Sequence, residues 1–404
     1  MPAARYDCGA RLKFKLMDTG SLIILIHHSS VCRSRLSQLP QMSSPPPPPL
    51  SRMILRCAPL GVVSQAVSSF LGAGDSLALA DALDAVTSHP LPNARYVQRV
   101  VEEVMRQCAR FQMETPEAAF DLLACAVRGG DDGGIMSFFT TDVGGVVREP
   151  LRVWSSALLS DVSTSLWPAA FHLIDGAVRV FARSIAGRHV LELGAGTGLV
   201  GLALSRLVQP APRVTITDGC VKACERARTV LCCDNTIATR DGKVDLAVEL
   251  LDWMDEVPAW AHEAAEVIVA SDVVYDPTVA PALTKTLSAL LDATADADTI
   301  ILPANSSGAA RTADDDFTSS LFTMVTHGEV NRFALFANEL RNAQTYEAFV
   351  REVEAAGLMY ADITDRVAAW VQETGGAVLE RTDAEHNVRL AIIVPKRVAF
   401  SRCK

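Results

Sequence analysis

The residues best suited to chemistry begin with a glycine-rich segment in the middle of the chain. Residues 190–201 read Val-Leu-Glu-Leu-Gly-Ala-Gly-Thr-Gly-Leu-Val-Gly, which predicts a buried strand, a glycine turn and a helix that starts near Leu199. Glycines allow a sharp turn and a close approach to a ligand, and the start of a helix offers free N–H groups. Asp218 ends the next predicted strand, 214–217, where a carboxylate can accept hydrogen bonds from both hydroxyls of a ribose. Together these features predict a site for a nucleoside-containing cofactor.

Two cofactors fit this glycine spacing. Gly196, Gly198 and Gly201 satisfy GxGxxG, the fingerprint of dinucleotide binding, which is a weak signal when it stands alone. The same segment also reads Glu192-x-Gly194-x-Gly196-x-Gly198, and this pattern resembles that of class I methyltransferases, which bind S-adenosylmethionine (SAM). That resemblance implies that Glu192 lies near the amino group of the methionine part of the cofactor.

Polar residues at the ends of two further strands favour SAM. Asp252-Trp253 follows a predicted strand, and a carboxylate beside an indole suits an adenine ring, by a hydrogen bond to its amine and by stacking. A fourth buried strand, 267–270, leads into Asp272-Val273-Val274-Tyr275 at the edge of the sheet where such folds bind ligands. Trp167 precedes a helix opened by Pro168 and would reach the same edge, although a core position explains it equally well.

The elements that must position these residues alternate along the second half of the chain. Short apolar runs at 189–193, 214–217, 245–250 and 267–270 are separated by helical stretches. This alternation predicts an α/β fold, a Rossmann-like parallel sheet with helices on both faces. Upstream, Val97 to Cys108 carries apolar residues at the spacing of one helix face, and a second helix is predicted after Thr115-Pro116.

Composition divides the chain into three predicted parts. Residues 1–52 are rich in Lys, Arg and Ser and include five consecutive prolines, so we expect a disordered leader or a segment outside the working protein; an organelle transit peptide is the alternative. Residues 53–135 are predicted to form a helical region with a packing or substrate-recognition role. Residues 136–400 would form the cofactor-binding domain, after the break at Gly129 to Gly134.

Charge and cysteine content restrict the function classes. The formal net charge of −10 disfavours nucleic acid and anionic membranes as partners, and the apolar run 22–26 is too short to span a bilayer. The ten cysteines show no framework spacing, which fits a reducing compartment, and we predict a cytoplasmic monomer. Cys220, Cys224, Cys232 and Cys233 lack a nearby histidine, so we predict no metal site.

The motif set resembles the seven-strand protein-lysine methyltransferases of methyltransferase family 16, whose hallmark is Asp-x-x-Tyr after the fourth strand. The helical half is similar to the branch that contains the eukaryotic elongation factor 2 lysine methyltransferase, through Ser88-His89-Pro90-Leu91-Pro92 and Arg341 to Tyr346. The resemblance covers roughly residues 75–397. It implies an enzyme that transfers a methyl group from SAM to a lysine of a protein similar to elongation factor 2. It also implies a lysine-facing role for Asp272 and Tyr275 and contacts with SAM for a set of residues. That set is Trp167, Glu192, Gly194, Ala195, Gly196, Gly198, Asp218, Asp252, Trp253 and Ser271.

The chain departs from the family pattern after the fourth strand. Residues 299–302 and 332–337 are both strand-like, and we predict that 332–337 is the fifth strand because the Arg341 match follows it directly. Residues 303–331 would then be an inserted loop, with Asp314 to Asp316 in solvent. The final strand is predicted at 388–394, antiparallel and next to the fifth.

Three rival functions remain open. A nucleic-acid amino-methyltransferase usually has Pro-Pro-aromatic after the fourth strand, where this chain has Val273 and Val274. A nicotinamide-dependent oxidoreductase leaves Asp252-Trp253 and the Asp272 to Tyr275 motif unexplained. A non-catalytic protein that keeps the fold and binds SAM as part of an interaction is the third, and another acceptor protein for the same enzyme is a further alternative.

Overall fold

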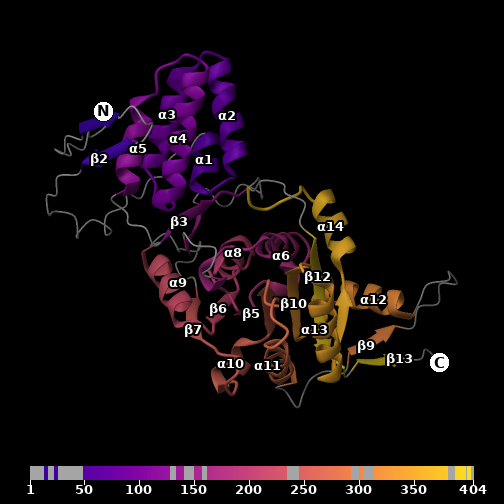
Figure 1. The fold of residues 1–404 in the computed structure, drawn as a ribbon. Helices are drawn as coiled ribbons and strands as arrows, with labels where there is room; N and C mark the ends of the chain where they lie inside the picture. The colour runs from indigo at the N-terminus through magenta and orange to yellow at the C-terminus, as the bar shows by residue number, and fades with distance from the viewer. Residues whose placement is uncertain are drawn as a thin grey trace. The chain divides into compact units, whose positions relative to one another are not determined.

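The structure is a computed structural model. It describes residues 13–16, 22–25, 49–127, 133–140, 150–156, 162–233, 245–292, 300–303, 313–380, 387–396 and 398–401. The chain divides into two compact units, residues 1–42 and 43–404. In the first unit, β1 (Lys13–Leu16) pairs antiparallel with β2 (Leu22–Leu25), within the predicted leader. The second unit holds the predicted helical region and cofactor-binding domain (Figure 1).

Five helices build the N-terminal part of the second unit: α1 (Pro49–Leu55), α2 (Leu60–Gly72), α3 (Ser76–Thr87), α4 (Ala94–Arg110) and α5 (Glu117–Val127). The predicted stripe from Val97 to Cys108 is the buried face of α4, and Asn93 caps that helix through the Tyr96 N–H. The predicted boundary at residue 52 is wrong by a few residues, because α1 already begins at Pro49. Proline is tolerated at the first position of a helix. The side chain of Ile54 is buried and anchors this helix in the core.

A β-hairpin links the helices to the rest of the second unit. β3 (Gly133–Phe138) pairs antiparallel with β4 (Leu151–Ser156), so the boundary predicted at residue 135 falls inside β3. The Ile135 N–H donates to the Leu91 carbonyl at 3.0 Å. On the α1 side, Arg52 Nε lies 3.2 Å from Glu380 Oε2. Most of the predicted glycine break lies outside the described residues.

The central sheet has seven strands in the order β11-β12-β10-β8-β5-β6-β7. Its strands are β5 (His189–Leu193), β6 (Arg213–Asp218), β7 (Leu246–Leu250), β8 (Val267–Ser271), β10 (Phe333–Glu339), β11 (Leu358–Asp362) and β12 (Val388–Pro395). The pairings among β5, β6, β7, β8 and β10 are parallel, whereas β12 runs antiparallel to both β10 and β11. The predicted strands and their α/β arrangement are confirmed.

The choice of fifth strand is also confirmed. β10 pairs with β8 from Phe333↔Val267 to Ala337↔Ser271, and the final strand lies next to it from Ala334↔Ile393 to Glu339↔Val388. The competing segment forms β9 (Ile300–Pro303), which pairs with β13 (Val398–Ser401) in a separate two-stranded sheet.

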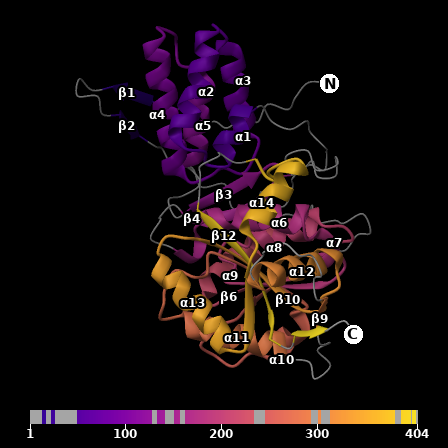
Figure 2. The ribbon, with the colours of Figure 1, turned by 90° about the vertical axis from the view of Figure 1, so that its right-hand side faces the viewer.

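Helices cover both faces of the sheet (Figures 1 and 2). Side chains of α6 (Pro168–Arg179), α8 (Leu199–Leu207), α9 (Val221–Cys233) and α14 (Thr364–Glu373) share one core with Val190 and Val267. Those of α10 (Ala259–Ala264), α11 (Ala280–Asp292) and α13 (Ala343–Ala355) share a second core with Leu191 and Ile268. Alternate side chains of β5 and β8 therefore pack into opposite cores. Because both faces of these strands are buried, the strands are apolar along most of their length.

The predicted inserted loop is wrong in its main part. Residues 313–327 form α12 (Ala313–His327), and Asp314 to Asp316 lie in its first turn. Leu321, Phe322 and Val325 are buried, and the Phe322 ring packs edge-on against Phe181 at 5.8 Å. Near it lies the short helix α7 (Ala182–Ile185), whose Ser184 hydroxyl donates to the Val325 carbonyl. The insertion is thus part of the core. In the parts of the chain that the structure describes, no helix is long and apolar enough to cross a membrane.

Candidate active site

The glycine turn joins β5 to α8 and requires its glycines. Gly194, Gly196 and Gly198 have φ values of +59°, +54° and +74°, a left-handed conformation that other residues rarely adopt. A Cβ on Gly194 would lie 2.8 Å from the Val273 side chain and 3.0 Å from the Trp253 ring. The turn therefore packs directly against the segments that follow β7 and β8.

Glu192 and Gly198 lie behind this turn and do not line the pocket. Glu192 is 1% exposed, and its Oε2 accepts the Gly201 N–H at 2.8 Å while Oε1 is buried with no hydrogen-bond partner. Burial raises the pKa of Glu192 to about 8 against the opposing hydrogen bond from Gly201. The side chain turns toward Gly201 of α8, and its expected place near the methionine amino group stays a prediction. Gly198 begins α8 and would crowd Ile216 if it carried a Cβ.

A pocket of about 530 Å³ opens at the carboxyl ends of β5, β6, β7 and β8. Apart from Glu192 and Gly198, every residue predicted for the site lines it, namely Trp167, Gly194, Ala195, Gly196, Asp218, Asp252, Trp253, Ser271, Asp272 and Tyr275. Segments separated by over 100 residues thus meet at one edge of the sheet, as the parallel topology requires.

Asp218, the last residue of β6, lines the pocket. Its Oδ2 accepts the Gly196 N–H and its Oδ1 accepts the Cys220 N–H, both at 2.8 Å. These bonds orient the carboxylate and leave each oxygen a further lone pair for a hydroxyl group. Burial raises the pKa of Asp218, and the two backbone hydrogen bonds oppose that effect. The arrangement suits a pair of ribose hydroxyls.

Asp252 and Trp253 form the adjoining wall. The Trp253 ring packs on Gly194, and its Nε1 is buried without a hydrogen-bond partner. Asp252 Oδ1 accepts the Met254 N–H at 3.0 Å, which fixes the turn after β7. A flat aromatic face beside a carboxylate matches the shape and hydrogen-bonding needs of an adenine ring.

The segment after β8 also lines the pocket, through Ser271, Asp272, Val273 and Tyr275. Asp272 has φ of +57°, and its N–H continues the sheet by donating to the Ala337 carbonyl at 2.8 Å. Both carboxylate oxygens of Asp272 bind the guanidinium of Arg341, at 3.1 and 2.7 Å. Tyr275 is 55% exposed, and burial and the nearby Asp218 raise the pKa of its hydroxyl, so it is neutral at physiological pH.

Trp167 caps the start of α6, as the following proline predicts. The guanidinium of Arg341 lies over its ring, 4.8 Å from the centroid, a distance typical of a cation–π contact. The structure therefore assigns Trp167 to the pocket edge and not to the core.

Sequence reasoning missed several pocket residues. Ser163, Ser165, Thr197 and Cys220 also line the pocket. Thr197 and Cys220 lie within two residues of predicted site residues, so their place in the sequence could have indicated that they line the pocket. The sequence indicates Arg341 only as part of the family resemblance. A single arginine after a strand has no spacing pattern that would predict its contact with Asp272.

Of the four cysteines considered for a metal site, Cys220 and Cys224 have described side chains, and both are free thiols. Cys224 is buried, and its sulfur lies 3.5 Å from the carbonyl oxygens of Asp218 and Glu249. Within the described ranges, no group of three or more His, Cys, Asp or Glu residues is placed to hold a metal ion. The side chains of Cys232 and Cys233 are outside the described part.

The strand order, with the pocket over the ends of β5, β6, β7 and β8, is that of a class I SAM-dependent methyltransferase. Residues 147–323 match the family described as lysine methyltransferase, which confirms the predicted resemblance to methyltransferase family 16. SAM is accordingly its cofactor.

Relatives point to the same branch. Human FAM86B2 is 28% identical over 233 residues, 54% of this chain and 68% of that protein. The human protein-lysine N-methyltransferase EEF2KMT is 28% identical over 218 residues, 50% and 64% of the two chains. Protein-lysine N-methyltransferase EFM3 of Saccharomyces cerevisiae is 29% identical over 166 residues, 38% and 47%.

Among solved structures, the magnesium protoporphyrin IX methyltransferase of Synechocystis with bound SAH is similar at 13% identity and a TM-score of 0.30. It covers 55% of this chain and 81% of that one. A likeness this low adds nothing to the assignment.

Proposed function

We propose that the protein transfers the methyl group of SAM to a lysine of a protein similar to elongation factor 2. The single observation that carries the proposal is the exposed Tyr275 on the wall of the cofactor pocket, in the Asp-x-x-Tyr motif that follows β8. The similarity to EEF2KMT and EFM3 supports a protein lysine as acceptor. The name of EEF2KMT supports elongation factor 2 as the first acceptor to test.

The proposed cofactor contacts follow from the lining of the pocket. Asp218 would bind the ribose, Asp252 and Trp253 the adenine, and the Gly194 to Gly196 turn the methionine part, beside Ser271 and Trp167. When bound, SAM supplies a methyl group on a positively charged sulfur. The residues of the chain contribute alignment of the acceptor and exclusion of water.

The reaction is an in-line displacement that needs a neutral amine. The lone pair of the lysine Nζ forms the new N–C bond as the S–C bond breaks, and the sulfur keeps that electron pair. The methylated ammonium then loses a proton to solvent. Burial of the incoming lysine against a wall that includes the Tyr275 ring would lower its pKa, because burial disfavours its charged form.

The test uses elongation factor 2 made in bacteria, radiolabelled SAM and the full chain. We expect label on one lysine, located by mass spectrometry. Label that appears on a chaperone or calmodulin in a cell extract, with none on elongation factor 2, would overturn the proposed acceptor and keep the enzyme class. Binding of adenosylhomocysteine with no transfer to any protein would support the non-catalytic alternative.

A matched pair of variants tests the cofactor site. Asp218→Asn removes the charge that faces the ribose, and we expect about tenfold weaker binding of adenosylhomocysteine by calorimetry. Asp276→Asn alters an exposed carboxylate near Tyr275 that bonds Thr278 and does not line the pocket, so its affinity should stay unchanged. Equal affinities in all three proteins would contradict the assignment of Asp218, and tighter binding of NAD(H) would favour the oxidoreductase.

We further propose that the enzyme acts as a cytoplasmic monomer without contact to nucleic acid or membrane. The acidic net charge supports this proposal. Size-exclusion chromatography with light scattering and microscopy of a tagged chain would test these points.

A further inference from the structure

The guanidinium of Arg341 ties three segments together at the mouth of the pocket. It binds both oxygens of Asp272 after β8, at 3.1 and 2.7 Å, and it lies over the Trp167 ring at the start of α6. Its Nη2 also lies 2.6 Å from Glu339 Oε2 at the end of β10. A two-pronged arginine–carboxylate pair fixes orientation as well as distance.

Asp272 is closed to an incoming lysine. Its side chain is 2% exposed, and its Oδ1 also accepts the Glu339 N–H at 3.1 Å. A substrate ammonium could reach this carboxylate only by displacing Arg341. Tyr275, three residues later, is accessible at the same wall.

The cluster around the pair carries a formal net charge of −1. One guanidinium faces the two carboxylates of Asp272 and Glu339, and α6 contributes the Trp167 indole. On β12, Arg389 lies 3.7 Å from Asp362 in a separate pair. Asp218 and Asp276 lie near the Tyr275 hydroxyl, and Cys220 and Asp252 are further titratable groups of the pocket lining.

We propose that Arg341 is a positioning residue for methyl transfer, which locks Asp272 and Trp167 into one rigid wall and leaves Tyr275 to contact the lysine. This inference rests on the proposed lysine methylation. It assigns Asp272 a role through Arg341, in place of direct contact with the substrate. With Arg341 present, the charge of the Asp272 carboxylate is already paired. The carboxylate therefore stabilises the ammonium form of the acceptor lysine only weakly. Without Arg341, a free Asp272 carboxylate would hold the lysine as an ammonium and raise its pKa.

The test is a double-mutant cycle of Asp272→Asn, Arg341→Met and the double variant, read as kcat for methyl transfer. We expect each single change to lower kcat about 10- to 100-fold, because the wall loses its alignment. The double variant should be no slower than the slower single variant, since both changes remove the same unit. Arg389→Met is the matched control, an arginine from another aspartate pair of the same sheet, and it should leave kcat unchanged.

The pH dependence of kcat separates positioning from a loss of folding. In Arg341→Met the acidic limb of the kcat–pH profile should move to higher pH. In the double variant, Asp272→Asn should move this limb back to the position found in the unaltered chain. Arg341→Lys keeps the charge without the two-pronged geometry, so it should lose rate and retain the profile of the unaltered chain. Adenosylhomocysteine binding within about twofold of the unaltered chain would show that each variant is folded.

Distinct outcomes overturn the two proposals. Independent, multiplicative losses in the cycle, with an unmoved pH profile, would show that Asp272 binds the lysine directly and would overturn the role of Arg341. Full activity of Arg341→Met would do the same. An unaltered chain that labels other lysines but not elongation factor 2 would overturn only the acceptor, because the cycle is then read on those lysines. A chain that labels no lysine would overturn both.

Discussion

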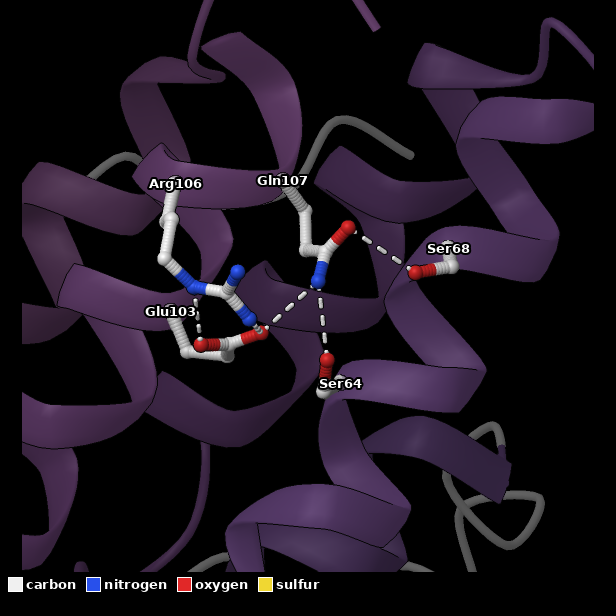
Figure 3. A network of polar contacts seen from close by, with 5 residues as sticks. All are labelled: Ser64, Ser68, Glu103, Arg106 and Gln107. Carbon is white, nitrogen blue, oxygen red and sulfur yellow. Dashed lines mark hydrogen bonds and ion pairs between the residues drawn. The ribbon is translucent and has the colours of Figure 1, made fainter. Parts of the chain in front are cut away.

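Two buried polar side chains differ in how fully they are hydrogen-bonded. They are Gln107 in the helical region and Glu192 in β5, next to the glycine turn. Gln107 is 2% exposed, and both ends of its amide are bonded (Figure 3). It donates to the Ser64 hydroxyl and to Glu103 at 2.9 Å and accepts from Ser68 at 3.0 Å. Glu192 is equally buried but has one oxygen without a partner.

The carboxyl groups of the two regions diverge for the same reason. Arg106 hydrogen-bonds Glu103, which lowers the pKa of that carboxyl to about 2 despite partial burial. Burial without a cation raises the pKa of Glu192 to about 8. The Gln107 amide thus has complete polar contacts, whereas Glu192 in the sheet keeps one buried oxygen without a hydrogen-bond partner.

The largest expected effect comes from a substitution that crowds Glu192, at Gly201 in α8. A Cβ in Gly201→Ala would lie 2.5 Å from Glu192 Oε2 and 2.7 Å from Ile216, so we expect a loss of about 3 kcal/mol in the free energy of unfolding. Gly61→Ala in α2 is the control, because no atom lies within 4 Å of its added Cβ and stability should rise by about 0.5 kcal/mol. Urea unfolding measures both, and equal behaviour would contradict the packing of Glu192 against α8.

The next effect concerns the charge of Glu192. Its folded pKa is above its unfolded value, so the folded chain holds an extra proton between about pH 4.5 and 8, and stability falls as the pH rises through this range. Glu192→Gln cannot ionise, so it should be about 2 kcal/mol more stable than the unaltered chain at pH 8 and similar at pH 4.5. Unfolding curves across this range, without cofactor, check the prediction. Parallel pH profiles for the two proteins would refute it.

A smaller loss is expected in the helical region. Gln107→Ala would leave Ser64, Ser68 and Glu103 without their shared amide, and we expect a cost of about 1–2 kcal/mol. Adenosylhomocysteine affinity should not change, because the network is not part of the pocket lining. A drop in cofactor affinity as large as that of Asp218→Asn would show that the two regions are coupled.

The smallest effect concerns Glu103. Its folded pKa is lowered, so its contribution is present above about pH 4.5 and is lost as the pH falls toward 2. Because Arg106 is largely exposed, solvent screens the pair, and Glu103→Gln should cost only about 0.5 kcal/mol at pH 7. Thermal melts at pH 7 and pH 3 measure the difference, which should shrink at the lower pH. An undiminished difference at pH 3 would argue for lost packing.

Strand and turn patterns made most of the sheet predictable. The strand at His189–Leu193 and the helix start at Leu199 lie where the apolar run and the glycines predict them. The fifth strand was chosen correctly because Arg341 follows it at the expected distance. Local pattern sufficed here because buried parallel strands are apolar on both faces.

The errors arose where distant contacts overrule local composition. An acidic run and polar residues at 313–320 resemble a solvated loop, yet Leu321, Phe322 and Val325 bury one face of α12 against the core. Glu192 matches a ligand motif, but its side chain turns toward Gly201. Neither result is visible until the neighbouring segments are in place.

The order of residues along the chain decided the cofactor class, because a glycine turn, an acidic strand end and a carboxylate–indole pair meet at one edge in any parallel sheet of this topology. Only the folded chain decided which of these side chains reach the pocket and which partner each one takes. Arg341 reaches Asp272 across 69 positions, and a contact between segments so far apart depends on packing geometry that no local pattern encodes.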